Sequence, residues 1–227
     1  MKLAIDCRMI NNSGIGNVLK CILRYLPDEW NYLFIGNSDE LKQYIHNNVE
    51  ILDCRIPIFS KSELFKFPVK QVNDCDLFFS PNYNLPIGIK IPIFSMIHDV
   101  VFLDIPKLTS KIGYLIRYFY LMRAVVISKK IFTVSQFSMN RIIHYFGNKK
   151  KISYIYNSIP FYLKENLNKY QEKKIGKYFL YVGNVKPHKG IDVLIDAFKK
   201  LNNPEYDLII VGKKDSLGHP ILYATTD

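Results

Sequence analysis

The amino-acid sequence predicts an α/β protein built around a doubly wound, mainly parallel β-sheet. Apolar runs of strand length alternate along residues 1–163 with stretches whose apolar residues recur at helical spacing. A polar stretch over residues 164–175 interrupts this pattern, which then restarts. We therefore expect one domain over residues 1–163, a linker over 164–175 and the start of a second domain over 176–227.

The first domain begins with a strand, a polar turn and a helix that Pro27 ends. Helices then connect the strands, as parallel pairing requires, and Ser135 stands where its hydroxyl caps the last predicted helix of the domain. The predicted strands lie at residues 2–7, 31–36, 76–80, 91–96, 130–134 and 152–155. The predicted helices lie at residues 15–26, 39–46, 107–127 and 135–145.

The second domain is predicted to have a strand at 178–182, a turn at 183–190, a helix at 191–201 and a strand at 206–211. Two strands and one helix cannot cover both faces of a sheet. The apolar residues Leu194, Ile195, Ile209 and Ile210 are therefore expected to have too few partners. Because the residues after Gly212 predict neither a helix nor a strand, we expect this domain to be incomplete.

The composition indicates an ordinary globular protein and excludes several classes. Of 227 residues, 48% are hydrophobic and 22% charged, which excludes a disordered chain or a coiled coil. No apolar run reaches the roughly 18–20 residues of a membrane span, and Asp6 and Arg8 interrupt any signal peptide. The four cysteines lack metal-ligand spacing and are expected to be reduced core residues. We expect a cytoplasmic protein.

The net charge of +11 comes from one segment of the chain. No acidic residue lies between Asp104 and Glu165, whereas eleven lysines and arginines do. A field of one sign favours an anionic partner such as phosphate, nucleic acid or acidic lipid. The alternative is a solvated basic face without a dedicated partner.

The helix predicted at 107–127 helps to choose between these partners. Its cations point in different directions around the helix axis, so they form a diffuse field rather than a binding stripe. Five apolar residues share one face, which we expect to pack into the core: Ile112, Leu115, Ile116, Phe119 and Met122. If this face is buried, the aromatic residues are mostly unavailable for stacking on bases, which disfavours a nucleic-acid partner. The diffuse positive field favours an anionic membrane surface instead.

A glycine-containing loop follows the first strand. Gly14 and Gly16 stand between that strand and the first helix, where glycine lets backbone N–H groups approach an anion at the positive end of a helix. The third glycine of a dinucleotide-binding fingerprint is absent. A purely structural turn is therefore at least as well supported by this feature alone.

His98 and Asp99 follow the strand predicted at 91–96, at the carboxyl end where open α/β sheets place their sites. A histidine there can bond to a hydroxyl group or accept its proton, with Asp99 or a backbone group fixing the tautomer. The alternative, equally supported without further context, is a loop histidine that satisfies local backbone groups.

The turn at 183–190 carries Lys186 and Lys189 between a strand that ends near Gly183 and a helix. Two ammonium groups beside a helix N-terminus suit a diphosphate group. The alternative is that both lysines are solvated turn residues.

Taken together, these motifs resemble those of the family 4 retaining glycosyltransferases, which have the GT-B fold. The matching segments occur in the family's order and span nearly the whole chain: Ser13–Asn17, His98–Pro106, Thr133–Ser138, Tyr156–Pro160 and Tyr181–Phe198. The resemblance implies a Rossmann-like, acceptor-side first domain and the first strand–helix–strand of a second Rossmann-like domain, which binds a nucleotide sugar. It also implies sugar transfer with retention of anomeric configuration, with no metal and no cofactor.

The resemblance also implies a role for each motif. His98, with Asp99, would contact the transferred sugar, and Lys189, helped by Lys186 and Gly183, would bind the donor diphosphate. Gly14 and Gly16 would back the cleft near the donor phosphates. Asn17, Ser135 and Asn157 would line the acceptor side of that cleft. The implied acceptor is a saccharide or a lipid-linked saccharide of surface polysaccharide or glycolipid synthesis, which places the enzyme on the inner face of a membrane.

Two departures from the family pattern qualify this picture. Asn184 or His188 stands where many members carry arginine, so Lys186 is expected to supply part of that charge. The family's pair of glutamates spaced eight residues apart is absent, so we expect a truncated chain or one half of a split enzyme with a separately encoded C-terminal half. The alternative function is an inactive membrane- or acceptor-binding module derived from such an enzyme, and no nucleic-acid partner is expected.

Overall fold

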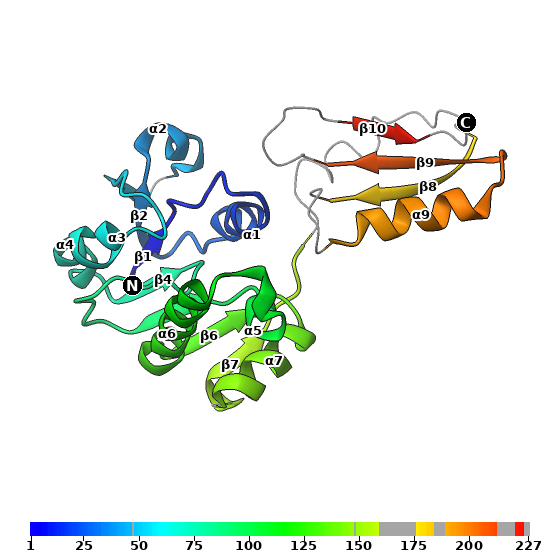
Figure 1. Cartoon of the computed structure of the whole chain (residues 1–227). Helices are drawn as coiled ribbons and strands as arrows, with labels where there is room; N and C mark the ends of the chain where they lie inside the picture. Colours follow the sequence, from blue (N-terminus) through cyan, green and yellow to red (C-terminus); the bar gives the residue numbers. More distant parts are fainter. Residues whose placement is uncertain (47, 148, 159–175, 184–188, 213–220, 225–227) are drawn as a thin grey trace. The chain divides into compact units, whose positions relative to one another are not determined.

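The computed structural model describes the chain except residues 47, 148, 159–175, 184–188, 213–220 and 225–227 (Figure 1). The chain divides into two compact units, residues 1–165 (unit 1) and 166–227 (unit 2). The candidate residues Lys186, Asn184 and His188 lie outside the described residues.

Unit 1 contains a seven-stranded sheet in which every neighbouring pair is parallel, with the order β3-β2-β1-β4-β5-β6-β7. This confirms the predicted doubly wound parallel sheet. The strands are β1 (Lys2–Asp6), β2 (Asn31–Gly36), β3 (Val49–Asp53), β4 (Leu77–Ser80), β5 (Ile93–Met96), β6 (Lys130–Thr133) and β7 (Ile152–Tyr154). The sequence analysis missed β3, an edge strand without a fully buried residue.

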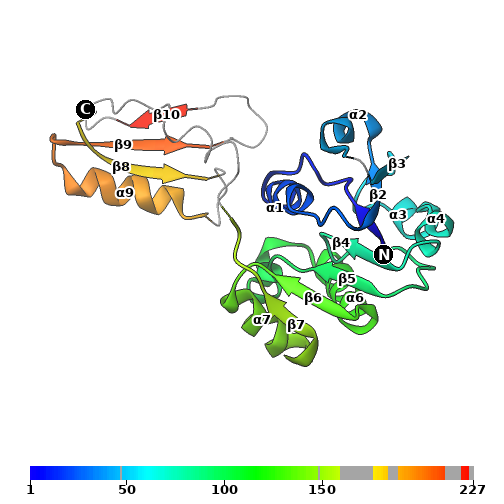
Figure 2. The same ribbon diagram turned by 180° about the vertical axis from the view of Figure 1, so that it is seen from behind.

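Helices cover both faces of this sheet (Figures 1 and 2). The α-helices are α1 (Ser13–Arg24), α2 (Ser38–Leu41), α3 (Lys61–Lys66), α4 (Val69–Asn73), α5 (Val101–Asp104), α6 (Lys111–Ile127) and α7 (Gln136–Phe146). Short 3-10 turns lie at Lys42–Tyr44, Pro106–Leu108 and Lys149–Lys151. The helix predicted at 39–46 is therefore α2 followed by a 3-10 turn.

Alternation along the strands divides the core into two layers. On one face, Leu3 and Ile5 of β1 pack with Leu19 of α1. On the other face, Ala4 of β1 belongs to a cluster with Phe78 of β4 and α6. A third cluster joins α5, α6 and α7 to β6 and β7.

Serine hydroxyls cap three of the described helices, α3 through Ser60, α6 through Ser110 and α7 through Ser135. The Ser135 hydroxyl accepts a hydrogen bond from the Ser138 N–H at 3.0 Å, which confirms the predicted cap of α7. The Ser110 hydroxyl accepts from the Gly113 N–H at 3.1 Å, so α6 begins at Lys111 rather than at residue 107.

The predicted core face of α6 is wrong. The five residues expected to be buried are exposed to solvent, from 71% for Ile112 down to 40% for Met122. The buried side of the helix is formed by Leu121, Ala124 and Val125 instead. Because α6 is apolar on both sides, periodicity alone did not identify the side that meets the sheet.

Unit 2 contains β8 (Lys177–Val182), α9 (Ile191–Leu201) and β9 (Tyr206–Val211), and β8 and β9 pair in parallel. This confirms the predicted strand–helix–strand. A further strand, β10 (Ile221–Ala224), pairs antiparallel with β9 and was not expected. Contrary to expectation, Leu194, Ile195 and Ile210 find partners, because α9 packs on one face of this sheet.

Three further findings concern the described parts of the chain. All four cysteines are free thiols, as expected. No group of three metal-ligating side chains occurs there. Among the helices that can be described, none has the length and apolar character needed to cross a bilayer.

Candidate functional site

The candidate site residues of unit 1 gather along the carboxyl edge of its sheet. Because all seven strands are parallel, the loops that follow them share this edge, where α/β proteins place their ligands. The segments after β1, β5, β6 and β7 supply Gly14, His98, Ser135 and Asn157 respectively.

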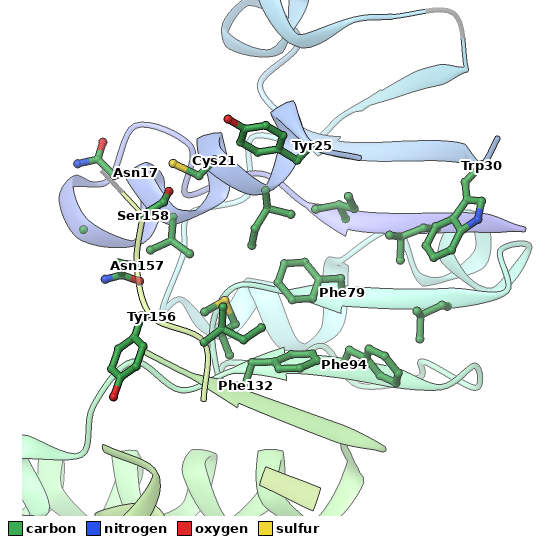
Figure 3. A pocket seen from close by; sticks show the side chains of 18 residues that line it. Asn17, Cys21, Tyr25, Trp30, Phe79, Phe94, Phe132, Tyr156, Asn157 and Ser158 are labelled. Carbon is green, nitrogen blue, oxygen red and sulfur yellow. The ribbon is translucent and has the colours of Figure 1, made fainter. Parts of the chain in front are cut away.

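A pocket of about 710 Å³ opens beside α1 (Figure 3). Its apolar floor consists of side chains from β1, β4, β5 and β6, and its wall is formed by α1 and residues 155–158. The lining residues are Leu3, Ile5, Gly14, Asn17, Val18, Cys21, Ile22, Tyr25, Trp30, Leu77, Phe79, Phe94, Met96, Phe132, Ile155, Tyr156, Asn157 and Ser158.

Two amide side chains and one hydroxyl side chain lie at one end of this pocket. Figure 3 shows Asn17, Asn157 and Ser158 close together, with Trp30 at the opposite end. The predicted site residues Gly14, Asn17 and Asn157 are thus brought to one pocket. An amide-lined mouth of this kind can donate and accept hydrogen bonds with sugar hydroxyls.

The two glycines of the first loop have different surroundings. A Cβ on Gly16 would lie 2.9 Å from the Met9 carbonyl oxygen and closer still to that of Ile10. A Cβ on Gly14 would meet no atom within 4 Å. Gly16 therefore permits α1 to approach the preceding turn, whereas Gly14 leaves open space at the pocket.

His98 lies outside the lining of this pocket, in the loop that follows β5. Its Nε2 atom is 3.1 Å from the carbonyl oxygen of Pro81, in the loop that follows β4. Burial lowers the pKa of His98 below the ordinary 6.5, against the opposing effects of the Pro81 carbonyl and Asp99. The neutral imidazole is thus favoured, with Nε2–H as the donor and Nδ1 as an available acceptor.

Asp99 and Ser135 serve the local backbone. The Asp99 carboxylate accepts a hydrogen bond from the N–H of Val101, the first residue of α5, at 3.2 Å. The Ser135 hydroxyl caps α7 and is absent from the pocket lining.

Sequence reasoning missed a buried charge network at the same edge. The guanidinium group of Arg8 donates to Asp6 and to Glu63, each at 2.6 Å, and the side chains of all three are at most 5% exposed. Glu63 also accepts hydrogen bonds from the Phe59 N–H at 2.7 Å and from the Asn84 side chain. This network fixes residues 59–63 and the loop after β4 to the end of β1. Because Glu63 is 55 residues from Arg8, no local pattern could reveal the pairing.

Two buried oxygen atoms near this edge lack a partner within the part of the chain that the structure describes. They are Oδ1 of Asn84 and Oγ1 of Thr133, at the end of β6. Buried polar groups are normally paired, so both atoms are exceptions among the buried polar groups of this part of the chain.

The residues predicted to bind the diphosphate belong to different units. Gly14 and Gly16 belong to unit 1, whereas Gly183 and Lys189 belong to unit 2. The N–H of Gly183 donates to the carbonyl of Val211 at 2.9 Å, which ties the end of β8 to β9. Lys189 is exposed immediately before α9, which begins after Gly190 in the left-handed conformation (φ 69°). Its ammonium group is therefore available near the positive end of a helix.

Comparison with known proteins supports the fold. Residues 164–222 match the family model described as glycosyl transferases group 1. A comparison with curated protein sequences gives no match.

Solved structures of several enzymes are similar to this chain. They include HepE from Anabaena in complex with UDP and glucose (TM-score 0.62, 20% identity, covering 94% of this chain and 61% of HepE). Another is a glycosyltransferase from Rickettsia africae (TM-score 0.55, 13% identity, covering 93% of this chain and 60% of the Rickettsia protein). A third is a UDP-GlcNAc 2-epimerase from Neisseria meningitidis bound to UDP-GlcNAc (TM-score 0.51, 14% identity, covering 94% of this chain and 66% of the epimerase).

At these identities the similarity shows the fold: unit 1 is a Rossmann-like domain of the GT-B type. The chain spans less than two thirds of the length of each of these three structures.

Proposed function

We propose that this chain is part of a glycosyltransferase that takes its sugar from a nucleotide-sugar donor. The observation that carries the proposal is the family-model match over residues 164–222, which includes Lys189 and the whole of α9. The similarity to HepE in its complex with UDP-glucose supports it (TM-score 0.61, 20% identity).

Lys189 is proposed to bind the donor diphosphate, together with Lys186 and Gly183. Breaking the bond between sugar and phosphate transfers negative charge to the leaving diphosphate. A cation placed beforehand at that position therefore stabilises the transition state more than the ground state. The start of α9 adds its partial positive charge.

His98 is proposed to contact the transferred sugar. Its Nδ1 atom can accept a hydrogen bond from a sugar hydroxyl, because Nε2–H is held by Pro81. Asp99 contributes by ordering the turn into α5. Asn17 and Asn157, at the polar end of the pocket, are proposed to bind the acceptor, with Ser135 shaping the neighbouring helix end.

The finer parts of the proposal rest on the family resemblance. They are retention of configuration, a saccharide or lipid-linked acceptor in surface polysaccharide or glycolipid synthesis, and transfer without a metal or cofactor. We also propose a cytoplasmic location on the inner face of an anionic membrane, because this location brings the enzyme to a lipid-linked acceptor.

A second candidate is an inactive membrane- or acceptor-binding module derived from such an enzyme. The observation that favours it is the basic stretch over residues 105–164, which has eleven lysines and arginines and no acidic residue. A module of this kind would bind an acceptor or a lipid surface without releasing nucleotide.

Incubation with UDP- and GDP-sugars separates the two candidates. The chain is tested alone and with any separately encoded C-terminal half, and released UDP or GDP is measured against sugar-free controls. Nucleotide release that depends on His98 and Lys189 supports the transferase. No release under any of these conditions would favour the inactive module.

A further inference from the structure

We propose that the exposed side of α6 attaches unit 1 to the surface of an anionic lipid bilayer. This outer α6 surface is defined as Ile112, Leu115, Ile116, Phe119, Met122 and Val126. The proposal rests on the proposed function, whose membrane partner it assigns to a particular surface. Its test measures lipid binding and is separate from the measurement of nucleotide release.

The outer α6 surface is a continuous apolar stripe. Its six residues follow the spacing of neighbours along one side of a helix, over four turns. Four of them are more than half exposed: Ile112 at 71%, Val126 at 66%, Leu115 at 64% and Phe119 at 54%. Scattered apolar residues are normal on protein surfaces, but a continuous stripe of this kind marks an interaction site.

Folding of unit 1 does not require this stripe. The opposite side of α6 supplies the core contacts, through Leu121 and Val125 in one cluster and Ala124 in another. In Figures 1 and 2, α6 lies on the outside of the sheet, as the outer layer of unit 1. The apolar character of its outer side therefore needs a reason other than the core.

The charges around the stripe select an anionic partner. Lys107 and Lys111 are exposed at the start of α6, and Lys129 is exposed just after its end. No acidic residue lies in α6 or anywhere from residue 105 to residue 164. Asp104, the nearest acidic residue in the sequence, is engaged by Arg141, whose Nε donates to it at 2.9 Å.

The one charged residue within the stripe is turned toward the protein. The guanidinium group of Arg123 donates to the carbonyl oxygens of Leu85 at 2.6 Å and Pro86 at 3.1 Å. Its charge is thus used to fasten α6 to the loop after β4. The stripe itself remains apolar between cations at both ends of the helix.

This combination fits a bilayer better than other anionic partners. An apolar helix face with lysines at its margins inserts at the boundary between headgroups and acyl chains, while the cations remain with anionic lipids. Single-stranded nucleic acid is bound on aromatic stacking platforms, and Phe119 is the only aromatic residue in the stripe. Duplex DNA is bound through its phosphates and groove edges, to which an apolar stripe offers no hydrogen-bonding group. A second copy of unit 1 would bring two basic segments together.

Vesicle flotation tests the proposal. The chain is mixed with vesicles of phosphatidylethanolamine and phosphatidylglycerol, or of phosphatidylcholine alone, at low and high salt. We expect binding to the anionic vesicles that weakens with salt. Replacing Leu115→Ser and Phe119→Ser together should lower the partition coefficient by about tenfold or more. The matched control is Val193→Ser, since Val193 is an apolar residue of α9 that is 72% exposed. This variant should bind the vesicles as the wild type does.

Charge variants keep the test decisive if the serine variant does not fold, as judged by circular dichroism. Lys107→Gln with Lys111→Gln should weaken binding to anionic vesicles, whereas Lys199→Gln with Lys200→Gln, on α9, should not. Equal vesicle binding by the wild type and the α6 variants would overturn the proposal. Vesicle binding that does not depend on phosphatidylglycerol would also overturn it. So would a dimer of the wild-type chain that the α6 serine substitutions dissociate, or tight binding of duplex DNA that phosphatidylglycerol vesicles do not displace.

Discussion

The Nε2 atom of His98 lies 3.1 Å from the carbonyl oxygen of Pro81, and this contact joins the loops after β4 and β5. A carbonyl oxygen only accepts hydrogen bonds, so Nε2 carries the proton. Burial lowers the pKa of His98, and Nδ1 of the neutral ring is left as an acceptor. The sequence located this histidine at the correct edge of the sheet, and the structure supplies its tautomer.

The lowered pKa of His98 predicts a specific dependence of stability on pH. Below the ordinary value of 6.5 the unfolded chain binds a proton that the folded protein binds less readily, so His98 destabilises the fold as the pH falls. We expect the difference in free energy of unfolding between the wild type and His98→Asn to shift against the wild type between about pH 7.5 and about pH 5.5. Urea unfolding over this range measures it. A difference that stays constant, or that moves in favour of the wild type as the pH falls, would contradict the assignment.

Gly14 and Gly16 form a matched pair for testing the first loop. Gly16→Ala places a Cβ against the carbonyl oxygens of Met9 and Ile10, and should lower the free energy of unfolding by about 1–3 kcal/mol. Gly14→Ala meets no neighbour and should change it by less than about 1 kcal/mol. Urea unfolding of both variants checks this. Equal losses would mean that α1 does not approach the preceding turn as described.

The buried network of Arg8 predicts a large loss of stability. Arg8→Met leaves the carboxylates of Asp6 and Glu63 close together and unpaired in the interior, which costs about 3–5 kcal/mol. The control is Arg55→Met, which breaks the exposed ion pairs with Asp39 and Asp53 and should cost at most about 1 kcal/mol. Chemical denaturation of both variants compares them. Similar small losses in both would show that Arg8 is not buried with its partners.

The sequence predicted those parts of the fold that local patterns determine. Helix 191–201 and strand 206–211 have the predicted bounds, because clear apolar periodicity and flanking turns mark them. Ser135 was identified as a cap from its position alone. β3 was missed because Glu50 and Asp53 break its apolar pattern, and a sheet edge does not require a buried run.

The parts that could not be predicted depend on contacts between distant residues. Glu63 reaches Arg8 only after the chain has folded. The orientation of α6 was predicted wrongly because both of its sides are apolar, and the arrangement of the sheet decides which side is buried. The pocket joins α1 to residues 155–158, more than a hundred residues away, and only Gly14, Asn17 and Asn157 had been selected from the sequence.

The most direct test of the account is the binding of UDP to lysine variants. The central claim is that the turn before α9 binds the donor diphosphate through Lys189. We predict that Lys189→Ala weakens UDP binding, measured by isothermal titration calorimetry, by roughly tenfold or more, since a charge-assisted hydrogen bond contributes about 1.5–3 kcal/mol. Lys129→Ala in unit 1 and Lys199→Ala at the far end of α9 should leave binding within about twofold of the wild type. Equal affinities for all three variants and the wild type would contradict the claim.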